Sequence, residues 1–195
     1  SNFPGLGAML LVYLIYAVAT AVYASVWPFF TAERFGWSPA MIGVSLTIYG
    51  VCFAIVQGAL VKPAIKRFGE YKTVIIGFGF EMFGLVLMSV ITNGTILLVL
   101  IPIAALGVVG QPALQAILSM GTSDDSQGIL QGVVASLSAI SMIIAPISMT
   151  WVFSVFTDKS APVYYPGAPF AVSACLLATG LYIFLHKGED AQKQS

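Results

Sequence analysis

The long uncharged stretches of this chain constrain its fold more than any other feature. Six apolar runs cover most of the 195 residues: 6–30, 39–61, 73–91, 95–119, 127–156 and 166–186. A helix that crosses a membrane needs about 20 such residues. Only 8% of the residues are charged, whereas soluble domains carry about 25%. We therefore predict an all-α membrane protein, with residues 1–195 forming one domain of six transmembrane helices.

The positive charges predict how these helices are oriented. Six of the eight lysines and arginines fall on one face of a six-span chain: Lys62, Lys66, Arg67, Lys72, Lys187 and Lys193. Arg34 and Lys159 fall on the other face. Because short cytoplasmic loops are enriched in positive residues, both termini are predicted to lie in the cytoplasm. Ser38 and Pro39 predict an N-cap and a first helical residue for the second span.

The sequence lacks the residues that several classes of function require. Net charge is zero, so no basic surface for nucleic acid is predicted. Cys52 and Cys175 lie in separate apolar runs without CxxC spacing, and His186 is the single histidine. These residues offer neither a metal cluster nor a nucleophile with its base. We expect no enzyme activity, no metal and no cofactor.

One acid lies inside an apolar run. Glu81 is the only charged residue between positions 73 and 91, about 14 Å along the helix from Lys72 and so near the centre of a bilayer about 30 Å thick. An acid at that depth costs about 2.5–3.5 kcal/mol on insertion scales and marks an ion or proton pathway by default. Gly77, Gly84 and Met88 share its helix face, which predicts that Glu81 points into the bundle.

Two interpretations of Glu81 remain open. Hydrocarbon favours the neutral form of a carboxyl group, so a cavity that opens and closes around Glu81 would let it bind and release a proton. Glu81 is then the proton-coupling residue, and the proton is the coupling ion. The alternative is a permanently protonated carboxyl that forms a hydrogen bond with a neighbouring helix.

Other polar side chains inside the apolar runs suggest a binding cavity. They are Gln57, Gln111, Gln115, Gln131 and Ser136, together with Tyr13, Tyr16 and Tyr49. Amides, aromatic rings and one acid suit a largely apolar, partly cationic organic molecule. Each glutamine taken alone is better explained by a hydrogen bond between helices, and only their collection around Glu81 would make a site. Gly128, Gly132 and Ser136 form a small-xxx-small ridge, which predicts close helix packing.

Four sequence segments resemble a known family. "ERFGWSPAMIGVSLTIYG", "KPAIKRFGE", "GQPALQAILS" and "QGILQGVVASLSAISMIIAP" occur in this order between about residues 32 and 146. They resemble the C-terminal half of the tetracycline efflux transporters, which are drug:proton antiporters of the major facilitator superfamily. The resemblance implies one half of a twelve-helix fold, a 3+3 inverted repeat, in a bacterial inner membrane.

The same resemblance assigns roles to individual residues. It implies that Glu81 couples proton movement and that Gln57 belongs to the substrate site. Arg67, Gly69 and Lys72 match a cytoplasmic loop that braces the gate. Phe53 stands where that branch has a histidine, so a coupling scheme that needs an imidazole does not carry over. The other substrate-binding candidates are Tyr49, Gln111, Gln115, Gln131 and Ser136.

The expected function is therefore proton-coupled export of drug-like organic compounds, tetracycline-type or multidrug. The expected partners are membrane lipid, a missing N-terminal half, and the small-molecule substrate. Because an isolated half would expose the face meant for its partner, homodimerisation is a further expectation. The alternatives are a non-transporting six-helix membrane module and a six-span transporter that is complete as a homodimer.

Overall fold

Helices account for almost all of the chain that the structure describes. The computed structural model describes residues 5–192, with side chains up to Lys187, so Lys193 lies outside the described residues. The α-helices are α1 (Leu6–Thr20), α2 (Val22–Phe35), α3 (Pro39–Ile55), α4 (Val61–Val90), α5 (Gly94–Ala105), α6 (Gly110–Met120), α7 (Gln127–Thr157) and α8 (Ala168–Gln192). Short turns of other helix types are η1 (Val56–Leu60), η2 (Leu106–Val109) and η3 (Asp124–Ser126). The prediction of an all-α chain is confirmed, since residues 5–192 contain no strand.

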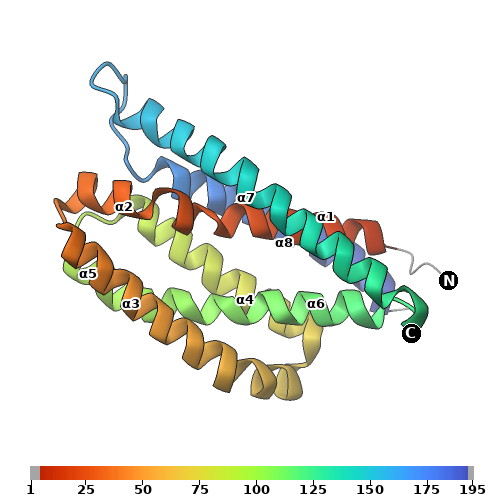
Figure 1. Cartoon of the computed structure of the whole chain (residues 1–195). Coiled ribbons are helices and arrows are strands. Elements are labelled where there is room, and N and C mark those ends of the chain that lie inside the picture. The colour runs from red at the N-terminus through yellow and green to blue at the C-terminus, as the bar shows by residue number, and fades with distance from the viewer. Residues whose placement is uncertain (1–4, 193–195) are drawn as a thin grey trace.

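Five helical stretches are long and apolar enough to cross a membrane. They cover Leu6–Phe35, Pro39–Val90, Gly94–Met120, Asp124–Thr157 and Ala168–Lys187. The second stretch is 52 residues long and combines α3, η1 and α4. Its backbone leaves the helical region at Gly69, where φ is 77° and ψ is 166°. Figure 1 shows that the chain turns back between α3 and the labelled part of α4.

The helices form two groups that pack against each other. One group contains α1, α2, α7 and α8, and the other contains α3, α4, α5 and α6 (Figure 1). Contacts of α4 with α8 and of α1 with α6 join the groups. The buried core lies along this junction and includes Tyr13, Phe78, Leu85 and Phe184. α4 thus lies where both groups can contact its buried face.

The entry to α3 matches its sequence signal. Ser38 is the N-cap, and its hydroxyl accepts a hydrogen bond from the Met41 backbone N–H at 3.3 Å. Pro39 is the first helical residue, where its missing N–H costs no helical hydrogen bond. The predicted cap is confirmed.

The small-xxx-small ridge of α7 does not pack as predicted. Ser136 is exposed, and a Cβ added at Gly128 or Gly132 would meet no atom within 4 Å. The ridge lies on a broad apolar surface, on which Ile143, Ile147 and other large side chains are also exposed. The spacing indicated a face suited to close approach, but no helix among residues 5–192 occupies it.

Candidate functional site

The buried face of α4 carries the acid. Glu81 is 3% exposed, and Gly77, Gly84 and Met88 on the same face are also buried. The prediction that Glu81 points into the bundle rather than toward lipid is therefore confirmed. Its neighbours at this face are backbone and small side chains, which leave room for a carboxyl group between helices.

Glycines bring α4 very close to the antiparallel stretch of α5, η2 and α6. A Cβ added at Gly77 would lie 2.5 Å from the Gly110 Cα, and one added at Gly84 would lie 2.9 Å from the Ala104 Cβ. Between these contacts, a Cβ added at Gly107 would lie 2.6 Å from Oε2 of Glu81. We call these residues the glycine seam: Gly77, Gly84, Ala104, Gly107 and Gly110. Only residues without a bulky side chain allow this approach.

A change of helix type occurs where the glycine seam passes Glu81. η2 is a 3-10 turn between α5 and α6, and Pro112 lies just beyond it in the first turn of α6. Proline has no N–H to bond the carbonyl of the residue four positions earlier, which here is Val108. The α-helical ladder is therefore interrupted at this point. The interruption takes the form of this short 3-10 turn.

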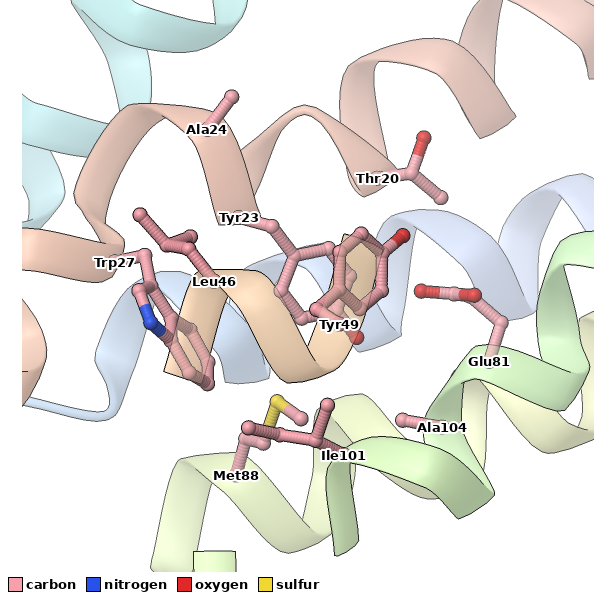
Figure 2. A pocket seen from close by; sticks show the side chains of 10 residues that line it. All are labelled: Thr20, Tyr23, Ala24, Trp27, Leu46, Tyr49, Glu81, Met88, Ile101 and Ala104. Atoms are coloured by element: carbon pink, nitrogen blue, oxygen red, sulfur yellow. The ribbon is translucent and has the colours of Figure 1, made fainter. Parts of the chain in front are cut away.

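An aromatic cavity of about 280 Å³ reaches Glu81. Tyr23, Trp27 and Tyr49 contribute its rings, and Glu81 is the only charged residue in its lining within the described part of the chain. The other lining residues are Thr20, Ala24, Leu46, Met88, Ile101 and Ala104. In Figure 2 the Glu81 carboxyl group points toward the rings of Tyr23 and Tyr49.

A second cavity, of about 290 Å³, reaches Glu81 as well. Its polar lining is richer than that of the aromatic cavity and includes Gln111, Ser138 and Ser141. Tyr16, Phe53, Val108 and Met142 also line it, and it shares Thr20, Ala24, Tyr49 and Glu81 with the aromatic cavity. We call it the polar cavity. Glu81 is the charged residue common to both.

The groups around Glu81 are hydroxyls rather than cations. Tyr16, Tyr23 and Tyr49 interact electrostatically with its carboxyl. The Tyr23 hydroxyl lies beside the carboxyl, yet within residues 5–192 its buried oxygen has no hydrogen-bond partner of acceptable geometry. Among the residues whose side chains the structure describes, 5–187, no lysine, arginine or histidine lines either cavity. An ionised Glu81 would therefore lack a counter-charge from the lining residues.

The structure brings together four of the predicted site residues. Glu81 and Tyr49 line both cavities, and Phe53 and Gln111 line the polar cavity. Phe53 is 39% exposed and its ring lies 6.1 Å from that of Tyr49, measured between centroids. Phe53, the residue that differs from the tetracycline branch, therefore lines the same cavity as Glu81.

The remaining predicted residues lie outside both cavities. Gln57 is half-buried within η1, a π-helical turn, and Gln131 and Ser136 are exposed on α7. Gln115 Nε2 donates to the Tyr13 hydroxyl at 3.4 Å, and the Tyr13 and Ser138 hydroxyls are hydrogen-bonded at 2.9 Å. Gln115 therefore forms a hydrogen bond between helices α6 and α1, which is the alternative stated for the glutamines above.

The predicted gate residues lie near the backbone break of α4. The positive φ of Gly69 explains why a glycine occupies this place, because residues with a Cβ rarely adopt such angles. Arg67 and Lys72 are exposed on either side of it, and the Arg67 guanidinium lies 5.6 Å from the centre of the Phe68 ring.

Sequence reasoning missed much of the aromatic cavity. Thr20, Tyr23 and Trp27 line it but were not among the predicted residues. A signal was present, because Tyr16, Thr20, Tyr23 and Trp27 follow one another at spacings of four, three and four residues. This spacing places all four on one helix face. Trp27 is fixed there by a hydrogen bond from its Nε1 to the Ser45 hydroxyl at 2.9 Å.

The chain is similar to several tetracycline resistance proteins. The chain is 37% identical over 147 residues to the class C tetracycline resistance protein of Escherichia coli, covering 75% of this chain and 37% of that protein. It is 37% identical over 150 residues to the class G protein of Vibrio anguillarum, covering 77% and 38%. It is 34% identical over 185 residues to the class E protein of Escherichia coli, covering 94% and 44%.

The chain thus spans about two fifths of the length of these curated relatives. The predicted resemblance to the tetracycline branch is confirmed by them. A sequence profile described as Major Facilitator Superfamily matches residues 9–195, nearly the whole chain. This multi-pass membrane protein therefore belongs to the Major Facilitator Superfamily.

Proposed function

We propose that the chain is part of a proton-coupled secondary transporter that exports drug-like organic compounds, with Glu81 as the residue that carries the proton. The observation that carries this proposal is the position of Glu81, which is buried yet lines two cavities. A carboxyl sealed between helices would have no route for proton exchange, whereas one at a cavity wall can meet water or substrate. The similarity to tetracycline resistance proteins supports export of a small molecule.

The proposal includes a division of the chain into six membrane crossings. A straight helix of 52 residues would be about 78 Å long, whereas the bilayer core is about 30 Å thick. The backbone break at Gly69 and the reversal of the chain in Figure 1 favour two crossings within Pro39–Val90. Six helices then form one half of a twelve-helix transporter in a bacterial inner membrane.

Charge favours cytoplasmic termini in this arrangement. Arg34 lies in the last turn of α2 and Lys159 in the loop between α7 and α8, and the Tyr164 hydroxyl of that loop donates a hydrogen bond to Glu33 of α2 at 2.6 Å. In Figure 1 the start of α1 and the end of α8 lie at the opposite end of the bundle from the loop between α7 and α8. We place Arg67, Gly69 and Lys72 in a cytoplasmic loop that braces the gate.

Transport in proteoliposomes tests the role of Glu81. The protein is expressed from its complete reading frame, and uptake of a dye and antibiotic panel into inside-out vesicles is driven by a pH gradient. We expect Glu81→Gln to abolish gradient-driven transport of every compound while leaving insertion into the membrane intact. Asp125→Asn is the control, because it removes an exposed carboxylate of η3 that lines neither cavity and lies outside the gate loop. Gradient-driven transport that survives in Glu81→Gln would refute the assignment.

A further inference from the structure

We propose that Tyr13, with Gln115 and Ser138, closes a water route by which protons leave Glu81 through the interior of this helix bundle, apart from the route of the substrate. The inference rests on the proposed function and adds to it a path for the proton and a residue that closes the path. The path joins the polar cavity to a third cavity near the start of α1.

The third cavity has a volume of about 230 Å³ and lies beside the turn between α6 and α7. We call it the inner cavity. Leu10 of α1 and Val133 of α7 belong to its apolar wall, and Thr122, Ser123 and Ser126 bring hydroxyl groups that can hold water. In Figure 1 this turn lies at the same end of the bundle as the start of α1, which the proposed topology places in the cytoplasm.

The inner cavity and the polar cavity follow one another along the same helices. On α1, Leu10 lines the inner cavity and Tyr16 the polar cavity; on α7, Val133 lines the first and Ser138 the second. These positions are six and five residues apart, which is about 8–9 Å along a helix axis. α6 runs from Gln111, in the polar cavity, to the turn that lines the inner cavity. A short stretch of three helices therefore separates the two spaces.

Buried side chains fill that short stretch. Tyr13 of α1, Leu118 of α6 and Val134 of α7 are 2%, 1% and 7% exposed, and α1 contacts both other helices. The residues between the cavities span less than two helical turns. Water in the polar cavity is thus held back by one closed layer, which we call the closing layer: Tyr13, Gln115, Leu118 and Val134.

Tyr13 is fixed in the closing layer by a directed chain of hydrogen bonds. Gln115 Nε2 donates to the Tyr13 hydroxyl at 3.4 Å, and the Ser138 hydroxyl donates to the Val134 carbonyl at 3.0 Å. A hydroxyl has one hydrogen to donate, so Tyr13 is the donor in its 2.9 Å bond with Ser138. One side chain thus connects α6, α1 and α7. Breaking its two bonds frees the three helices from one another at this level.

An open closing layer would let water extend from Glu81 to the end of the bundle. Glu81 lines the polar cavity, so its carboxyl group can pass one proton to water there and keep one negative charge. The aromatic cavity lies on the other side of Glu81, because Tyr23 and Trp27 follow Tyr16 along the chain, away from the inner cavity. The closing layer is therefore the barrier on one side of the acid only.

Proton leak in the absence of substrate tests the closing role of Tyr13. The protein, expressed from its complete reading frame, is reconstituted in liposomes that contain a pH-sensitive dye, with valinomycin and potassium to balance charge. Tyr13→Phe keeps the ring but loses both bonds of the hydroxyl, and each lost bond raises the open fraction about twofold or more. We expect the imposed pH gradient to decay about fourfold faster or more. Tyr182→Phe is the matched control, because Tyr182 is 61% exposed and is absent from the described linings of all three cavities.

Two further variants test where the route leads. Adding Glu81→Gln to Tyr13→Phe should return the leak to the unmodified level, because the route ends at the acid. Leu10→Trp, which enlarges a side chain in the inner cavity and leaves Tyr13 in place, should slow gradient-driven transport severalfold without changing the KM of the transported dye.

An unmodified leak in Tyr13→Phe, a leak that persists in the double variant, or normal transport in Leu10→Trp would overturn the route. If Glu81→Gln abolishes gradient-driven transport alongside such a result, the proposed function stands and only the path is wrong. If Glu81→Gln leaves transport unchanged, the proposed function itself fails.

Discussion

Replacing Gly77 by alanine tests how tightly the glycine seam holds α4 beside Glu81. The added Cβ would lie 2.5 Å from the Gly110 Cα and 2.9 Å from the Gly107 carbonyl oxygen. The nearest atom is the Gly110 backbone nitrogen at 2.4 Å, and ordinary Cβ contacts begin at 3.4 Å, so the helices must separate locally by about 1.0 Å. All three obstacles are backbone atoms, which cannot rotate away. Overpacking of this kind costs about 1–3 kcal/mol.

Gly79→Ala is the matched control, two residues along the same helix. An added Cβ there meets nothing within 4 Å, so the variant gains only the higher helix propensity of alanine, about 1 kcal/mol. Gly77→Ala gains the same propensity, so the two variants should differ in stability by the overpacking cost alone, about 1–3 kcal/mol, or at least about 2 °C in Tm for a domain of this size. Thermal unfolding of both variants in detergent measures this difference. Equal Tm values would refute the close packing at the glycine seam.

Three smaller predictions concern the ends and turns of the helices. Ser38→Ala removes the N-cap acceptor of α3 and should cost about 0.5–2 kcal/mol in chemical unfolding, whereas Ser38→Asp, which retains an acceptor, should not. Gly69→Ala places a Cβ on a residue with φ 77° and ψ 166°, and should lower the free energy of unfolding by about 1–3 kcal/mol in the same assay. The space around Gly69 is open, so the cost comes from the backbone angles alone, and an unchanged unfolding midpoint would contradict it. The Ser160 hydroxyl and backbone N–H donate hydrogen bonds to the Asp158 carboxylate, which lowers the pKa of that carboxyl. The ionised Asp158 therefore stabilises the folded chain at pH values above its ordinary pKa, and this stabilisation is lost as the pH falls through the lowered pKa. Ser160→Ala should raise the Asp158 pKa toward its ordinary value in a carbon-13 NMR titration, and an unmoved titration would contradict this.

Local signals in the sequence predicted local structure well. Ser38 and Pro39 begin α3 as their chemistry requires, and the face shared by Gly77, Glu81 and Met88 is buried. Both predictions depend on the spacing of residues within one helix, and this spacing can be read directly from the sequence. The same holds for the all-α fold, because each apolar run is sufficient to form a helix without knowledge of its neighbours.

Predictions about contacts between helices were less complete. The ridge at Gly128 and Gly132 has the spacing for close packing, but spacing does not say which helix would cover it. Gln131 shares that exposed surface, whereas Gln111 faces the polar cavity. In the sequence, each is simply a glutamine inside an apolar run, so the two cannot be distinguished there. Their place depends on how the two helix groups meet.

The residues of the aromatic cavity could not be assigned from the sequence for the same reason. Tyr23 and Trp27 are ordinary residues of an apolar run, and aromatic side chains at helical spacing fit a packed core equally well. They become part of a site because α3 and the glycine seam bring Tyr49 and Glu81 to the same space. That coincidence involves helices far apart in the sequence.

The protonation of Glu81 itself is the most direct test of this account. Infrared difference spectroscopy on the reconstituted protein records the C=O stretching band of protonated carboxyl groups as the pH is raised. We predict that one such band disappears reversibly and that Glu81→Gln lacks it from the start. A Glu81 band that persists from acidic to alkaline pH would show a permanently protonated carboxyl and contradict proton coupling at this residue.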